Sequence, residues 1–149
     1  MSDMSLDDLY RRVIMDHYQK PRNKGKMEND AVSVELNNPT CGDKIYLQMR
    51  VEDGKIVDAK FTGEGCSISM ASASMMTEAV KGLTVDESLK LVDLFSRMML
   101  GEEVDVDQFP LEDIEALTGV AKFPARIKCA TLAWKALEKG LGDNHSKEA

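Results

Sequence analysis

The sequence has few of the features that would place the protein in a membrane or on a nucleic acid. Its 149 residues contain no apolar run near the roughly 18 residues of a membrane-spanning helix, and no signal-peptide pattern opens the chain. Lys and Arg number 19 against 26 Asp and Glu, for a net charge of −7. The clustered basic surface that binds phosphates is therefore not expected. We expect a cytoplasmic protein with no membrane or nucleic-acid partner.

Cysteine and histidine are also scarce, with three and two residues. An odd number of cysteines argues against a disulfide framework, since thiols stay reduced in the cytoplasm. His145 lies in a polar tail, and His17 follows the apolar stripe of an expected helix, which favours a structural or capping role. A Cys–His nucleophilic pair therefore lacks an evident histidine.

Hydrophobic periodicity changes along the chain and predicts the fold class. Apolar residues at helical spacing predict a first helix that ends at Pro21, and later residues alternate as in strands. Asp53-Gly54 predicts a tight hairpin between two of the strands. Thr84 and Glu87 have the spacing of a capping box, and Gly140 is expected to end the final helix. The expected strands cover about 31–36, 45–51 and 57–61, and the later helices cover about 67–80, 84–101 and 124–139, with a short helix from Pro110.

This order of elements predicts an α+β fold, in which a small three-stranded antiparallel sheet packs against helices. No internal repeat or linker divides the sequence. We therefore expect a single domain over residues 1–149, with about 140–149 as a flexible tail.

The three cysteines all lie near the ends of expected elements. Cys41 and Asp43 are two residues apart, so both side chains can face one ion from extended backbone. Cys66 follows two glycines and precedes a helix, and Cys129 lies in the first turns of the last helix, after Arg126 and beside Lys128. Three thiolates and a carboxylate suit tetrahedral zinc or an iron–sulfur cluster. The cysteines are much farther apart than the ligand pairs of a zinc finger, so spacing alone leaves buried, inert cysteines as an equal alternative.

Four motifs together resemble those of the U-type iron–sulfur assembly proteins, the family of IscU and of the N-terminal part of NifU. The similarity runs from Leu9 to Gly140. It implies a SufE/NifU-like α+β fold with Cys41, Asp43, Cys66 and Cys129 as metal ligands. It also implies that Cys41 accepts sulfur from the persulfide of a pyridoxal-phosphate cysteine desulfurase. The motifs are Asp16–Tyr18 with Pro21–Asn23, Asn38–Asp43, Gly63–Ser69, and Phe123-Pro124 leading to Cys129.

Two departures from the IscU branch place the resemblance in the SufU branch. Lys128 stands where IscU-like proteins carry a histidine, and the interval between the second and third cysteines is longer, within 83–115. The leading hypothesis is a zinc-dependent sulfurtransferase that takes sulfur from a SufS-like desulfurase and passes it to a SufBCD-like scaffold. One alternative is a scaffold on which a [2Fe–2S] cluster is assembled. The other is a non-catalytic desulfurase-activating module with structural zinc.

Overall fold

The three strands form an antiparallel sheet in the order β1-β2-β3, as the sequence predicts. The computed structural model describes residues 2–28, 32–38, 42–102 and 114–148. In it β1 spans Val32–Asn38, β2 spans Asp43–Glu52 and β3 spans Lys55–Glu64. Asp53 and Gly54 join β2 to β3 with φ angles of 51° and 75°, the left-handed backbone that a two-residue hairpin requires. The predicted hairpin is confirmed.

One face of the sheet carries the apolar core. A bulge in β3 changes which of its residues lie on that face. Ile45, Leu47 and Met49 of β2 are fully buried. The register shifts between Arg50 and Val51, so that Val51 pairs with Ile56 while Arg50 pairs with Asp58. Val57 is left without a partner in this pairing and is 39% exposed, whereas Ile56 is buried. The alternation of apolar and charged residues over 57–61 predicts that Val57 shares the inner face with Ala59 and Phe61. This prediction is wrong for Val57, because the extra residue reverses the alternation.

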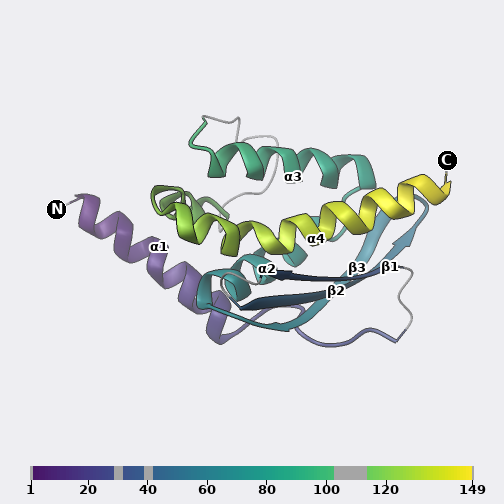
Figure 1. Cartoon of the computed structure of the whole chain (residues 1–149), viewed down its shortest axis with the longest axis horizontal. Coiled ribbons are helices and arrows are strands. Elements are labelled where there is room, and N and C mark those ends of the chain that lie inside the picture. The colour runs from purple at the N-terminus through teal and green to yellow at the C-terminus, as the bar shows by residue number, and fades with distance from the viewer. Residues whose placement is uncertain (1, 29–31, 39–41, 103–113, 149) are drawn as a thin grey trace.

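The helices form layers on the apolar face of the sheet (Figure 1). The helix α4 (Pro124–Glu148) contacts β1 and β2, and α2 (Ser67–Val80) contacts β3 and α4. The helix α3 (Val85–Met99) packs on α4 on the side away from the sheet. Phe95 of α3 stacks on Trp134 of α4 with ring centroids 4.4 Å apart. The predicted fold class is confirmed.

The end of α4 differs from the prediction. The helix continues past Gly140 to Glu148. A Cβ atom at Gly140 would lie 3.0 Å from side-chain atoms of Met49, Val32 and Val34. Gly140 therefore acts as a close-packing position in the helix, where the missing side chain lets α4 approach the sheet.

The N-terminal helix α1 (Ser2–Gln19) is held against α2 by buried polar contacts. Nδ1 of the fully buried His17 lies 2.8 Å from the Ser74 hydroxyl, which also accepts the backbone N–H of Arg22 at 2.8 Å. His17 thus has the structural role that the sequence predicts.

The short helix expected from Pro110 lies outside the described residues. The 3-10 helix η2 (Ile114–Lys122), which the sequence patterns did not predict, contacts α1 and α4. None of the helices within the described ranges has the length and apolar character to cross a membrane.

Candidate metal centre

Asp43 supplies a buried carboxylate at the start of β2. It pairs with Asn38 across the β1–β2 ladder, and its side chain is only 1% exposed. The Cys66 backbone N–H donates a hydrogen bond to Asp43 Oδ1 at 3.0 Å. Oδ2 has no hydrogen-bond partner among the described residues. Because an unpaired buried carboxylate oxygen is costly, this atom calls for a cation or another donor.

Cys66 lies where the chain leaves β3 and begins α2. It is the N-cap of that helix, with extended backbone angles of −72° and 167°, and its Sγ accepts the Ser69 backbone N–H at 3.4 Å. Backbone N–H groups and the positive end of the helix dipole favour negative charge at such a position. The prediction that Cys66 immediately precedes a helix is confirmed.

Cys129 approaches from the opposite side, in the second turn of α4, and is fully buried. The position of this turn is tied to α2, since the Ser72 hydroxyl donates to the carbonyl of Ala130 at 2.6 Å. Ser72 also accepts the Trp134 indole N–H at 3.0 Å. The helix that begins after Cys66 is therefore joined to α4 at the residue that follows Cys129.

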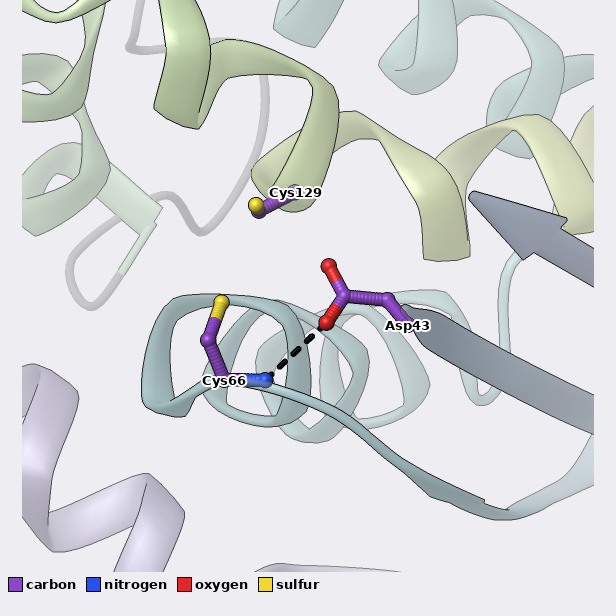
Figure 2. A group of neighbouring side chains, drawn as sticks. All are labelled: Asp43, Cys66 and Cys129. Carbon is purple, nitrogen blue, oxygen red and sulfur yellow. Dashed lines mark hydrogen bonds between the residues drawn. The ribbon is translucent and has the colours of Figure 1, made fainter. Parts of the chain in front are cut away.

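Three of the four predicted ligands come together in the structure. One ligand atom from each of Asp43, Cys66 and Cys129 lies within 4.8 Å of the others. Figure 2 shows both sulfurs and the second oxygen of Asp43 facing a common space between β2, α2 and α4. Cys41, the fourth predicted ligand and the predicted sulfur acceptor, lies outside the described residues. Thiolates with one carboxylate oxygen suit zinc, and the unpaired Asp43 Oδ2 fits such an ion.

The surface beside Cys129 is basic and partly apolar. Arg126 and Lys128 are both exposed near the start of α4, and Phe123 is 61% exposed immediately before that helix. Neither cation is buried in the site, so both lie where an approaching protein could meet them.

Sequence reasoning missed two residues that support the site. Ser72 links α2 to α4, and Gly65 lies against Asp43, where an added Cβ would come within 2.3 Å of Oδ1. A role for Ser72 in helix packing could have been predicted, because a stretch of small and hydroxyl-bearing residues in α2 indicates close packing against another helix. In the sequence Gly65 indicated only the end of a strand. Its contact with Asp43 could not be predicted, because the two residues are 22 positions apart.

The chain belongs to the family of the U-type assembly proteins, since residues 9–149 match the family described as NifU-like N terminal domain. The chain is 63% identical over 137 residues to the zinc-dependent sulfurtransferase SufU of Bacillus subtilis, covering 92% of each protein. It is 48% identical to the iron–sulfur cluster assembly scaffold protein IscU of Streptococcus pyogenes, covering 95% of this chain and 87% of that protein. The crystal structure of FiSufU from Fervidobacterium islandicum superposes with a TM-score of 0.81 at 39% identity, covering 87% of this chain and 93% of that one. The resemblance inferred from the motifs is confirmed.

Proposed function

We propose that the protein is a zinc-dependent sulfurtransferase of iron–sulfur cluster assembly. In this proposal it accepts persulfide sulfur from a cysteine desulfurase onto Cys41 and passes it to a downstream scaffold. The observation that carries the proposal is the convergence of Asp43, Cys66 and Cys129, with a buried carboxylate oxygen left unpaired. The 63% identity to a zinc-dependent sulfurtransferase supports the same role.

The metal would be held by Asp43 Oδ2 and by the sulfurs of Cys66 and Cys129, with Cys41 as the fourth ligand. Bound zinc keeps cysteine sulfur in the thiolate form at neutral pH. The protein contributes a fixed frame around it. The Cys66 N–H holds one Asp43 oxygen in place, the start of α2 favours negative charge on the Cys66 sulfur, and burial of Cys129 excludes water from one side.

The transfer step is a thiolate–persulfide exchange. The Cys41 thiolate attacks the outer sulfur of the desulfurase persulfide, and a new S–S bond forms on Cys41. The S–S bond on the desulfurase breaks, and its cysteine leaves as a thiolate. The sulfane sulfur keeps its oxidation state, so the exchange needs no external oxidant or reductant.

This chemistry requires a persulfide donor and a sulfur acceptor. The resemblance to the SufU branch supports a SufS-like cysteine desulfurase as the donor and a scaffold of the SufBCD type as the acceptor. Arg126 and Lys128 are exposed beside the centre of an otherwise acidic chain, where they would favour an acidic contact surface on a partner.

Relatives named as scaffolds support a second function. The 48% identity to an IscU scaffold protein makes assembly of a [2Fe–2S] cluster on the same ligands the main alternative. A non-catalytic desulfurase-activating module with structural zinc is the other alternative, and it requires that Cys41 never carries persulfide.

Two measurements separate these functions. The first is zinc, iron and acid-labile sulfide per chain in anaerobically purified protein, for which the proposal expects about one zinc and no sulfide. The second is desulfurase turnover with wild-type protein and with Cys41→Ala, followed by alkylation and mass spectrometry of Cys41. We expect Cys41→Ala to abolish stimulation and wild-type Cys41 to carry one extra sulfur. Stoichiometric iron and sulfide would favour the scaffold, and full stimulation by Cys41→Ala would favour the structural module.

A further inference from the structure

The motif Gly63–Cys66 contains two glycines that make different close contacts. A Cβ at Gly63 would lie 2.1 Å from the carbonyl oxygen of Lys44, so this glycine allows β3 to pass close to the backbone of β2. The three atoms nearest to a Cβ at Gly65 would instead all belong to the side chain of Asp43, with Oδ1 at 2.3 Å, Cγ at 2.9 Å and Cβ at 3.1 Å. Ordinary Cβ atoms do not approach a neighbour so closely. The Asp43 carboxylate therefore occupies the space that a side chain at position 65 would take.

We propose that Gly65 is a positioning residue, whose missing side chain lets the Asp43 carboxylate lie on the Gly65–Cys66 backbone with Oδ2 turned toward the two sulfurs. This inference rests on the proposed metal-binding function. It assigns to Gly65 a task separate from the turn into α2. The ligand that Gly65 supports comes from β2, 22 residues earlier in the sequence.

The contacts of Asp43 explain how this support works. Oδ1 is engaged by the Cys66 N–H at 3.0 Å, and Oδ2 remains buried without a partner among the described residues. The hydrogen bond thus fixes which oxygen is available and where it points (Figure 2). A methyl group at position 65 would displace Oδ1, break this hydrogen bond and move Oδ2 away from its present place near the Cys66 and Cys129 sulfurs.

The effect on metal affinity follows from the ligand set. Gly65→Ala leaves every cysteine in the chain but misplaces the one carboxylate oxygen. Loss of a group that orients a ligand typically weakens metal binding by about 10- to 100-fold. We expect Gly65→Ala to weaken zinc binding within this range, and to speed hydrogen exchange of the Cys66 amide in the metal-free protein because its hydrogen bond to Asp43 is lost.

A double-mutant cycle tests the contact directly. The four proteins are wild type, Gly65→Ala, Asp43→Ala and the double variant, and the readouts are zinc affinity by chelator competition and the hydrogen-exchange rate of the Cys66 amide in metal-free protein. Because Asp43→Ala removes Oδ1 and Cγ, adding Gly65→Ala to it should change zinc affinity by no more than about 2-fold, well below the loss expected for the single variant. An equal loss in both backgrounds would overturn the proposal, as would wild-type affinity together with a wild-type exchange rate of the Cys66 amide in Gly65→Ala.

Backbone strain and failure to fold need separate controls. Gly82→Ala changes a glycine with φ of 88° and nothing within 4 Å of the added Cβ, so it introduces strain away from the site. It should leave zinc affinity unchanged. If Gly65→Ala does not fold, the proposal requires that the double variant does, and an unfolded double variant would overturn it. If wild-type protein binds no zinc, the proposed function fails, while the exchange rate of the Cys66 amide still tests the Gly65–Asp43 contact.

Discussion

Replacing Ser72 with alanine tests whether the connection between α2 and α4 sets the geometry of the metal centre. The buried Ser72 hydroxyl donates to the Ala130 carbonyl at 2.6 Å and accepts the Trp134 indole N–H at 3.0 Å. Ala130 directly follows the ligand Cys129. Loss of the hydroxyl should therefore lower stability and also loosen the position of one sulfur.

The expected size of the stability change follows from the groups left behind. The Trp134 side chain is 1% exposed, so its N–H loses its acceptor in a place that water does not reach. An unsatisfied buried donor costs about 1–3 kcal/mol. We take about 2 kcal/mol for Ser72→Ala, which lowers Tm by roughly 4–8 °C in a chain of this size.

Ser74→Ala is the matched control within the same helix. Ser74 is also fully buried, but its hydroxyl contacts His17 and Arg22 at the α1 side of the molecule. We expect a similar loss of Tm in metal-free protein for both variants. Zinc affinity by chelator competition should fall for Ser72→Ala and stay at the wild-type value for Ser74→Ala. Equal zinc affinities in the two variants, or an unchanged Tm for Ser72→Ala, would refute the reasoning.

Three further predictions concern the ligands, the sheet contact of α4 and the cap of α3. Zinc should raise the Tm of wild-type protein but not that of Cys129→Ser, because a bound ion stabilises only the state that binds it. A zinc-dependent Tm in the variant would contradict the assignment of Cys129 as a metal ligand. Gly140→Val should cost about 1–3 kcal/mol in urea unfolding by overpacking α4 on the sheet. Gly142→Ala, which meets nothing within 4 Å, should stabilise by about 0.5–1 kcal/mol, and equal effects of the two would refute the contact. Thr84→Ala should cost about 1 kcal/mol through loss of the N-cap. Hydrogen bonds with the backbone and hydroxyl of Thr84 lower the pKa of Glu87, so this carboxylate stabilises the folded state at neutral pH and loses that effect as the pH falls through its folded-state pKa. Urea unfolding at neutral and acidic pH should therefore show a steeper acid loss for wild type than for Glu87→Gln.

Local patterns in the sequence were sufficient for the features that depend on near neighbours. The Asp53-Gly54 hairpin follows from the backbone freedom of two adjacent residues. The capping box of α3 involves only Thr84 and Glu87, three residues apart, and both of its hydrogen bonds are present. The position of Cys66 ahead of α2 could be predicted for the same reason, since a glycine-rich break and a helical pattern meet at that residue.

The family motifs predicted which residues are the ligands, but the spacing of these residues in the sequence could not predict that they lie close together. Asp43, Cys66 and Cys129 belong to a strand and two helices, and their approach to within 4.8 Å depends on how those elements pack. The sequence also gave no sign of which Asp43 oxygen is available, because the Cys66 N–H that occupies Oδ1 comes from a distant segment. Cys41 remains a prediction from its motif.

Tertiary contacts decided the points at which the sequence predictions were wrong. The bulge opposite Val51 buries Ile56 and turns Val57 outward, although the alternation of β3 suggested the reverse. Gly140 resembles a helix end in isolation, yet α4 continues because the sheet lies against that position. Sequence patterns thus determined the three strands, the helices α1 to α4, their order and the donor types of the centre, since these follow from local backbone preference and chemistry. Packing between distant segments decided the helix length, the faces and the placement of each ligand atom, because a local pattern does not contain those contacts.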